Sequence, residues 1–446
     1  MPSEQQLWGA ETTKAVENFP ISGETVPTSV IHWLARIKGA AAIVNGELGL
    51  LSKRGASRIQ KAAAEIAAGK HDRQFPIDVF QTGSGTSTNT NANEVIAKLA
   101  TDTDPARPVH PNDHVNMGQS SNDVFPSAVH LAALDVAQNE LLPALKQLEL
   151  SFAKKAKSFH NVVKSGRTHL MDAVPITVGQ EFAGYAAQMA LGQERVQAAL
   201  IHVGQIPLGG TATGTGLNTH PRFAEKVRAR LKRESGLKQI AAPLDPFEAQ
   251  ANRDALVELS GALKVIAVSL TKIAGDLALM GSGPRAGIGE LFLPELQKGS
   301  SIMPGKVNPV IPEVVLQVSA QVIGNDTAIT VGGLQGQFEL NVRIPLIARN
   351  LLQSLALLSA AARVFAEKCV DGIQINKAGV EASAGATLAV ATALNGAIGY
   401  DKGTVIVNKA TESGRPLREV ALEEGVDAKL YDATIDLRKI ARGNQV

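Results

Sequence analysis

The sequence predicts an all-α protein whose middle region is a bundle of long helices. Between about residues 119 and 375 the chain is apolar and carries the periodicity of helices. Aromatic residues make up 4% of the chain, and its alanines and 41 glycines suit helices that pack closely. Alternating strands and helices are absent from the pattern, which argues against a Rossmann or TIM-barrel architecture.

Five stretches of the middle region read as long helices. Ser121 and Asn122 are good N-cap residues for the first of them, and Pro126 lies in its opening turns, where proline costs least. A helix over 250–281 is roughly 45 Å long at ~1.5 Å per residue, more than a compact domain needs. The predicted helices cover residues 122–157, 174–202, 250–281, 311–331 and 341–370.

The helix predicted over 256–280 is apolar on more than one side. Leu259, Leu263 and Ile266 lie on one part of its circumference, and Val257, Val265 and Val268 extend the apolar surface around it. A helix that is apolar all round is buried in a large core or in an assembly. We expect a homo-oligomer whose bundle continues across subunits, and one large monomeric core remains the alternative.

Changes in pattern along the chain predict three domains. Residues 1–118 form a mixed, mainly helical N-terminal domain, residues 119–375 the long-helix domain, and residues 376–446 a small C-terminal helical domain.

Charge and cysteine content exclude several classes of protein. A net charge of +2 over 446 residues gives no reason to expect a nucleic-acid or membrane surface. The single cysteine, Cys369, excludes an intrachain disulfide framework, a cysteine-based zinc cluster and an iron–sulfur cluster. Residues 1–20 lack a signal-peptide pattern, and charged residues interrupt the longest apolar segment. We therefore expect a cytoplasmic protein.

Two polar segments precede the first long helix. The run Gln81–Asn93 offers hydroxyls, amides and flexible backbone N–H groups, which suit an anion, although a solvated loop is an equal alternative. The segment 110–123 places His110 and His114 four residues apart, but Pro111 disfavours a helical metal pair and no third ligand follows. Ser120, Ser121 and Asn122 stand at a helix start, where an anion site and a plain N-cap are both possible.

Three further loops carry polar groups. His169 lies in Gly166–Asp172, and the hydroxyl-rich stretch 209–218 could be a plain connection. The segment Gly299–Pro309 resembles a P-loop, but it has one residue too many between its glycines and Val307 in place of Ser/Thr, so ATP binding is excluded. Lys306 and Asn308 in this loop could hold a carboxylate, and Ser300 or Ser301 could serve as a nucleophile or base.

Together these segments resemble the fumarase/aspartase superfamily, whose signature GSSxMPxKxN stands at 299–308, and the resemblance runs from about residue 12 to 437. It implies a three-domain helical fold that assembles as a homotetramer around a 20-helix core, five helices from each subunit. It also implies active sites shared by three subunits. Details such as His110–Asp113 and Gly166–Leu170 are most similar to class II fumarases, whereas Thr90, Met171 and Arg343 depart from the usual pattern.

The resemblance implies a hydro-lyase that interconverts fumarate and L-malate in the tricarboxylic acid cycle, through an aci-carboxylate and without cofactor or metal. It assigns catalysis to Ser300 as the base, with His169 and Glu313 at the leaving hydroxyl. The groups that hold the substrate carboxylates are Ser84, Thr86, Ser120, Ser121, Asn122, Thr168, Lys306 and Asn308. A second dicarboxylate site comprises His110, Asn112 and Asp113.

Two alternatives remain open. An aspartate ammonia-lyase would share the fold and the carbanion chemistry but would release ammonia. A non-catalytic structural homologue has no need for Ser300, His169 and Lys306 together, which argues against that reading.

Overall fold

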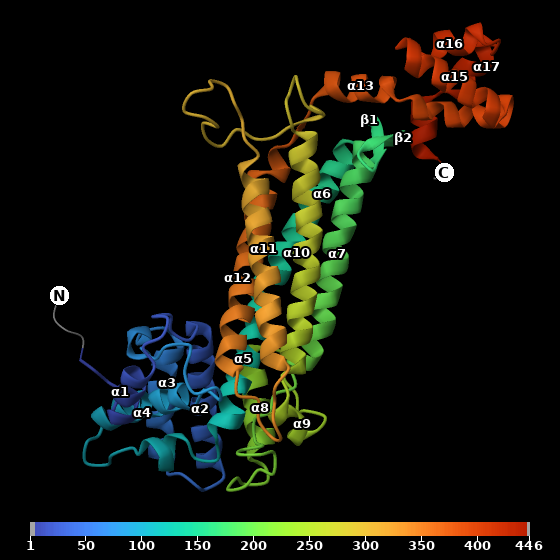
Figure 1. Cartoon of the computed structure of the whole chain (residues 1–446). Coiled ribbons are helices and arrows are strands. Elements are labelled where there is room, and N and C mark those ends of the chain that lie inside the picture. The colour runs from blue at the N-terminus through green and yellow to red at the C-terminus, as the bar shows by residue number, and fades with distance from the viewer. Residues whose placement is uncertain (1–4, 444–446) are drawn as a thin grey trace. The chain divides into compact units, whose positions relative to one another are not determined.

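The computed structural model describes residues 5–443, which are predominantly helical (Figure 1). Their contacts divide them into two compact units, described separately below: unit 1 contains residues 5–143, 192–267 and 318–359, and unit 2 contains 144–191, 268–317 and 360–443. Four of the long helices contribute a segment to each unit: α7 (Val178–Val203), α10 (Asp254–Met280), α11 (Val310–Gly333) and α12 (Ile344–Lys368).

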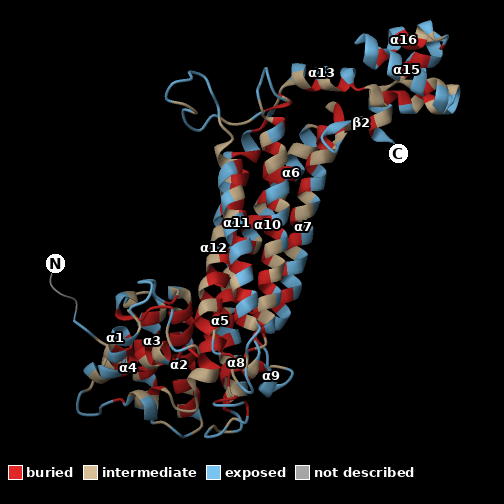
Figure 2. Ribbon diagram, in the orientation of Figure 1, coloured by how far each residue is buried: buried red, intermediate tan, exposed pale blue. Residues whose placement is uncertain are grey.

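Unit 1 is built on an antiparallel pair of helices, α2 and α3, which also supports α5. Both are amphipathic or apolar, and their alanine and glycine faces let them approach closely, as at Gly39 beside Ala63. Figure 2 shows the buried side of α2 facing its neighbours. The helices of this unit are α1 (Ala10–Asn18), α2 (Thr28–Glu47), α3 (Lys53–Ala67), α4 (Thr86–Asp102), α5 (Ser121–Val136), α8 (Phe223–Ser235) and α9 (Pro246–Ala251).

Polar contacts align the long-helix segments inside unit 1. Asp326 on α11 accepts from Ser260 Oγ at 2.7 Å and pairs with Lys264 Nζ at 2.6 Å, both on α10. Asn325 Nδ2 donates to the Gln353 and Ser354 side chains of α12 at 2.9 and 3.1 Å. Since buried polar groups must be satisfied, these bonds fix the register of three helices that apolar packing alone leaves less specific.

Unit 2 contains the other segments of these helices, a hairpin and the C-terminal helices. An aromatic cluster joins α6 (Leu142–Ser158), α7 and α12 through Phe152, whose ring centroid lies 6.1 Å from Phe182 and 6.0 Å from Phe365. Its strands are β1 (Val163–Thr168), β2 (Met171–Thr177), β3 (Leu291–Phe292) and β4 (Gln374–Ile375); β1 pairs with β2 and β3 with β4, both antiparallel.

The C-terminal helices pack around their own apolar cluster, which includes Leu394, Ile406, Val420 and Tyr431. These helices are α14 (Asn395–Ile398), α15 (Tyr400–Ser413), α16 (Leu417–Glu423), α17 (Ala428–Thr434) and α18 (Leu437–Arg442), whereas the preceding helix α13 (Lys377–Ala386) contacts β1. The division into three domains at residues 118 and 375 remains a prediction.

The five long helices form close to the predicted positions, with three corrections. The stretch predicted over 122–157 is α5 and α6, joined by a π-helical turn at Ala137–Leu141. Residues 174–177, which we expected to open a helix, belong to β2, so Pro175 is in a strand and α7 begins at Val178. Residues 250 and 251 end the separate helix α9, and α10 begins at Asp254.

A further correction concerns the polar run Gln81–Asn93. Its residues 86–93 are helical, since α4 begins at Thr86. The Gln81 side chain accepts from the Thr88 backbone N–H at 3.0 Å and so supplies the cap that the helix start requires. Asn89, Asn91 and Asn93 are buried on this helix, so tertiary contacts override their preference for loops.

Among the described residues, one helical stretch, Ile344–Gly372, has the length and apolar composition of a membrane-spanning helix. Of its most apolar window, 67% is buried within the structure, as in the core helix of a folded domain.

Candidate active site

In unit 1 a chain of hydroxyls joins the starts of α4 and α5. Ser84 Oγ lies 2.7 Å from Thr86 Oγ1, which lies 2.8 Å from Ser121 Oγ. Gly85 makes this approach possible: it has φ +75°, and a Cβ there would come within 2.2 Å of the Phe125 ring. The structure thus brings together three of the predicted carboxylate-binding residues.

Ser120 and Asn122 complete this side of the site. Ser120 forms a capping box, in which its Oγ accepts from the Asn122 N–H at 3.2 Å and its own N–H donates to Asp123 Oδ1 at 2.9 Å. Asn122 Nδ2 donates to the Ala212 carbonyl at 2.9 Å, so the stretch 209–218 is more than a connection. The positive end of the α5 dipole is adjacent, which favours an anion here.

Two buried charges behind this helix start were not assigned from the sequence. Burial lowers the pKa of Lys38 to about 7, and the charge of Asp123 partly opposes that shift. Burial raises the pKa of Asp123 to about 6 against the lowering effect of backbone N–H donors and Lys38. No motif singles out Lys38, because it is one of several charged or polar residues, such as Arg36 and Glu47, in the same helix.

The predicted second dicarboxylate site is an exposed turn of unit 1. His110 caps the π-helical turn Pro111–Val115, with its Nδ1 accepting from the Asn112 and Asp113 N–H groups at 3.3 and 3.1 Å. The His110 N–H donates to His114 Nδ1 at 2.8 Å. Both histidines therefore use a ring nitrogen for local structure, and no group of three possible metal ligands occurs within residues 5–443.

In unit 2, Thr168 and His169 lie at the tip of the β1–β2 hairpin. Thr168 pairs with Met171, and the two turn residues, His169 and Leu170, have φ of +56° and +61°. A two-residue hairpin turn requires this left-handed conformation, which costs about 1–3 kcal/mol for each residue that is not glycine. This turn places His169 at the exposed tip of the hairpin, next to the exposed side chains of Leu170 and Met171.

A buried ionic network holds the base of this hairpin. Glu290 accepts from both Arg167 Nη atoms at 3.1 and 2.9 Å, pairs with Lys164 Nζ at 2.9 Å and accepts from Ser383 Oγ at 2.8 Å. Burial raises the pKa of Glu290, but these donors outweigh that effect and hold it below its usual value. The sequence did not reveal this network, because its members are 93 or more positions apart from Glu290.

The loop Gly299–Pro309 is folded by its own polar groups. Ser300 Oγ accepts from the Ile302 and Met303 N–H groups at 3.2 and 3.0 Å, and Asn308 Nδ2 donates to the Gly299 carbonyl at 2.8 Å. A Cβ at Gly299 would lie 2.0 Å from the Lys306 carbonyl oxygen, so glycine is required there. Lys306 is exposed, as is Glu313 in the first turn of α11.

His169 and Glu313, which the resemblance pairs, share no hydrogen bond or ion pair within residues 5–443 of this single chain. Their pairing therefore remains a prediction, as do the roles of the other site residues.

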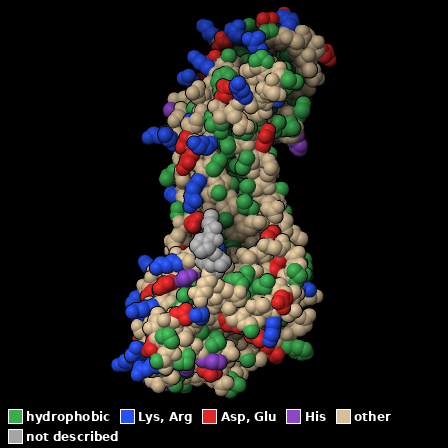
Figure 3. Space-filling view, turned by 90° about the vertical axis from the view of Figure 1, so that its left-hand side faces the viewer, with side chains coloured by type: hydrophobic (Ala, Val, Ile, Leu, Met, Phe, Trp, Pro, Cys, Tyr) green, Lys and Arg blue, Asp and Glu red, His purple; other side chains and the backbone are tan. Residues whose placement is uncertain are grey.

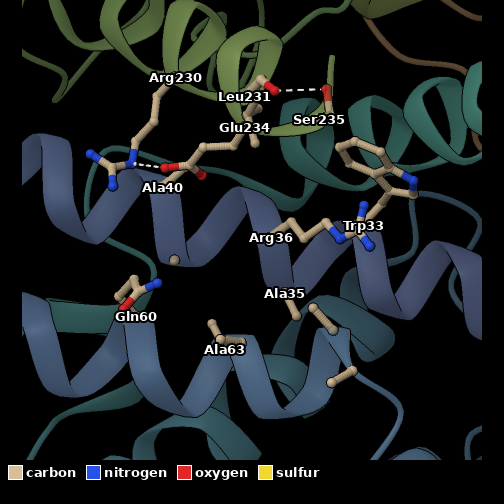
Figure 4. A pocket seen from close by; sticks show the side chains of 14 residues that line it. Trp33, Ala35, Arg36, Ala40, Gln60, Ala63, Arg230, Leu231, Glu234 and Ser235 are labelled. Carbon is tan, nitrogen blue, oxygen red and sulfur yellow. Dashed lines mark hydrogen bonds and ion pairs between the residues drawn. The ribbon is translucent and has the colours of Figure 1, made fainter. Parts of the chain in front are cut away.

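A separate cavity of about 490 Å³ lies between α2, α3 and α8 of unit 1 (Figure 4). Alanines make up much of its lining, and two charged residues of its rim, Arg230 and Glu234, form a 2.8 Å ion pair. It contains none of the predicted site residues.

Known proteins resemble this chain along almost its whole length. A family model described as a lyase matches residues 3–324, and one described as the fumarase C C-terminus matches residues 390–442. A class II fumarate hydratase from Corynebacterium efficiens is 55% identical over 97% of this chain and 92% of the relative. One from Mycobacterium tuberculosis is 52% identical, covering 99% of this chain and 94% of the relative.

Solved structures agree with this fold. The class II fumarase from Schistosoma mansoni superposes with a TM-score of 0.96 at 38% identity, covering 99% of this chain and 96% of that one. A fumarate lyase:delta crystallin from Brucella melitensis, bound to cobalt, gives a TM-score of 0.93 at 43% identity, covering 99% and 97%. The predicted mainly helical fumarase/aspartase fold is confirmed, and the chain belongs to the lyase family and, within it, to the class II fumarate hydratases.

Proposed function

We propose that the chain catalyses the reversible, stereospecific hydration of fumarate to L-malate, a step of the tricarboxylic acid cycle. We propose further that the reaction proceeds without a cofactor. The observation that carries the proposal is the environment of Ser300. Its hydroxyl oxygen accepts two backbone N–H groups in a loop with the signature of the family.

The reaction requires a strong base, because dehydration of malate removes a proton from the carbon beside a carboxylate. A serine hydroxyl is too weak an acid to supply an alkoxide in water. Hydrogen bonds donated to the oxygen favour its charged form, and Lys306 on the same loop adds positive charge. Closure of the loop on substrate would exclude water and strengthen both effects.

The aci-carboxylate intermediate needs donors for its developing negative charge. The hydroxyls of Ser84, Thr86 and Ser121 already lie within hydrogen-bonding distance of one another, and each can rotate to donate to a carboxylate. Ser120 and Asn122 add groups at the start of α5. On the other unit, Thr168, Lys306 and Asn308 are assigned to the same task.

The second proton transfer occurs at the hydroxyl that leaves as water. We assign it to His169 acting through a bound water, with Glu313 as the carboxylate that supports a charged imidazole. The exposure of both residues at loop ends is compatible with their completing a site built from several chains.

Exposed apolar residues on the long helices support assembly into a homotetramer with sites shared by three subunits. Val268 on α10 is 56% exposed and Val331 on α11 is 47% exposed, although other apolar residues of both helices are buried. Figure 3 shows hydrophobic side chains on one face of the molecule between charged ones. Apolar surface on long helices is stabilised when it is covered by a partner.

Two further assignments belong to the proposal. His110, Asn112 and Asp113 form the second dicarboxylate site, since their exposed turn leaves His110 Nε2 uncommitted to the cap. We place the protein in the cytoplasm, where the buried, unpaired Cys369 thiol would stay reduced; burial raises its pKa to about 12.

Ultraviolet absorbance of the fumarate double bond tests the proposal. Purified protein should generate the signal from L-malate and not from L-aspartate, with no metal or nucleotide added. A signal from aspartate alone would identify an ammonia-lyase on the same fold. Well-folded protein that responds to neither substrate would contradict the hydratase assignment and favour a non-catalytic homologue.

A further inference from the structure

Two fully buried charges lie behind the first turn of α5 in unit 1. Lys38 on α2 and Asp123 on α5 are both 0% exposed. Taking a charge out of water costs several kcal/mol unless hydrogen bonds and an opposite charge offset the loss. Two such residues beside one helix start therefore mark a place where the position of the backbone is strongly constrained.

Lys38 organises the segment that leads into α5. Its ammonium donates to Asn116 Oδ1 at 3.2 Å and to Gln119 Oε1 at 3.3 Å. Because both amide oxygens accept, the amide nitrogens must face the backbone: Asn116 Nδ2 donates to the Gln119 carbonyl at 3.1 Å, and Gln119 Nε2 donates to the Val115 carbonyl at 3.0 Å. The segment 115–119 is thus folded around one buried ammonium.

Asp123 organises the opposite side of the same turn. Its Oδ1 accepts from the Ser120 N–H at 2.9 Å, and its Oδ2 accepts from the Gly209 and Thr211 N–H groups at 2.9 and 3.1 Å. Thr211 has φ +54°, an unfavourable conformation for a residue with a branched side chain, which these bonds help to hold. The next residue, Ala212, is the one that accepts from Asn122.

The two charges support each other. Each opposes the effect of burial on the pKa of the other, so removing one leaves the other buried with only its hydrogen bonds to offset the lost hydration. Lys38 binds the segment 115–119, and Asp123 binds the segment 209–211 and the Ser120 N–H. The residues Ser120–Asn122 lie between these two anchored segments and Asp123.

We propose that Lys38 and Asp123 are positioning residues, which hold the turn Ser120–Asn122 in the orientation that binds a substrate carboxylate. The identity of that substrate as a four-carbon dicarboxylate rests on the proposed function. Neither residue touches the substrate in this proposal; both act through the backbone and side chains of the turn.

The experiment compares Lys38→Met, Asp123→Asn and the double variant in the full-length protein. Asp123→Asn can keep the acceptor for the Ser120 N–H, but its NH₂ group faces the Gly209 and Thr211 donors and releases that segment. We expect each single variant to raise the KM for L-malate and the Kd of the non-reacting dicarboxylate succinate about tenfold, with kcat changed by less than about threefold.

Arg58→Met is the matched control. Arg58 is a long cationic side chain of unit 1 that donates to the Ala100 and Arg107 carbonyls, and its hydrogen bonds and ion pairs within the described residues do not involve the turn. Its loss should lower stability while KM and the succinate Kd remain at the wild-type value.

If the folded single variants have the same KM for L-malate and the same Kd for succinate as the wild type, the proposal is overturned. If the single variants do not fold, the double variant decides, because it removes both charges together. Positioning predicts weak succinate binding in the double variant, whereas a role limited to charge balance predicts restored binding. A wild-type protein that binds succinate without interconverting fumarate and malate would contradict the proposed function alone. Failure of the wild type to bind succinate would contradict the assignment of the turn Ser120–Asn122 to a dicarboxylate, and with it the positioning role of the two residues.

Discussion

The hydroxyl cluster at the starts of α4 and α5 and the loop Gly299–Pro309 prepare for an anion in different ways. In the cluster, Thr86 and Ser121 are already bonded to each other, and the helix start that carries Ser121 rests on the buried charges of Lys38 and Asp123. The loop is exposed and is held mainly by bonds among its own residues. The buried charges below the hydroxyl cluster make that cluster rigid, whereas the exposed loop can move and close on a ligand.

This difference assigns different tasks to the two regions. A rigid set of neutral hydroxyls suits recognition of a carboxylate, because its donors are already near their working positions. A flexible loop with a serine and a lysine suits a step that needs water to be excluded only after substrate has entered. Variants in the loop should therefore affect turnover most, and variants in the cluster should affect affinity.

The largest effect is expected for Ser300→Ala. Loss of the base should lower kcat about 10⁴-fold and leave KM within about threefold, because the hydroxyl cluster is untouched. Fumarate absorbance with L-malate measures both constants. Ser301→Ala is the comparison: if it abolishes turnover and Ser300→Ala does not, the base is the neighbouring hydroxyl.

Glu290→Gln tests whether the hairpin that carries Thr168 and His169 has a rigid base of its own. Removing the charge takes the carboxylate partner from the part-buried Arg167 and leaves the buried Lys164 with Glu181 alone, so the free energy of unfolding should fall by about 3 kcal/mol at neutral pH, roughly 100-fold in the folded-to-unfolded ratio. Urea denaturation measures the change.

The pH dependence of this variant has a definite sign. The folded-state pKa of Glu290 is lowered, so its contribution to stability is complete above its usual value of 4.5 and is lost as the pH falls through the folded pKa. The difference between wild type and Glu290→Gln should therefore narrow at acid pH. Glu381→Gln, at an exposed ion pair with Lys377, should show little difference at any pH. A constant difference for Glu290→Gln would contradict the ionic account.

Lys306→Met removes the fixed positive charge of the loop. We expect kcat/KM to fall about 30-fold, since charge-assisted hydrogen bonds to a carboxylate are among the stronger ones. Lys298→Met, an exposed lysine just before the loop, should change it by less than about twofold. Equal losses in the two variants would indicate a general electrostatic effect on substrate approach.

Thr86→Val is expected to have the smallest effect. It breaks the central link of the hydroxyl cluster with little change in shape, so KM should rise about tenfold with kcat nearly unchanged. Thr82→Val, which breaks the 3.1 Å contact with Ser87 outside that chain of hydroxyls, serves as the control. A fall in kcat without a change in KM for Thr86→Val would reverse the tasks assigned to the two regions.

Much of this architecture could be predicted from local patterns. The long helices lie within a few residues of their expected positions, because apolar periodicity over 20 or more residues outweighs single exceptions. The helix start in this segment followed from its residue types, although the N-cap is Ser120 and not Ser121 or Asn122, which lie in the first turn. The signature loop at 299–308 pointed to the family, whose fold the solved structures share.

Local patterns failed where distant segments decide the conformation. Pro175 was placed at a helix start, but pairing with β1 draws it into a strand. Asn89 and Asn91 favour loops in isolation, yet burial against neighbouring segments keeps them helical.

By itself the sequence determined the helical class, the positions of the long helices and the residue types available for chemistry, because these follow from periodicity and side-chain identity. Only the tertiary structure decided which polar groups meet: Lys38 with Gln119, Asp123 with Gly209 and Thr211, and Glu290 with Arg167. A buried charge is stable only where particular donors and acceptors surround it, and that surrounding is created by the fold.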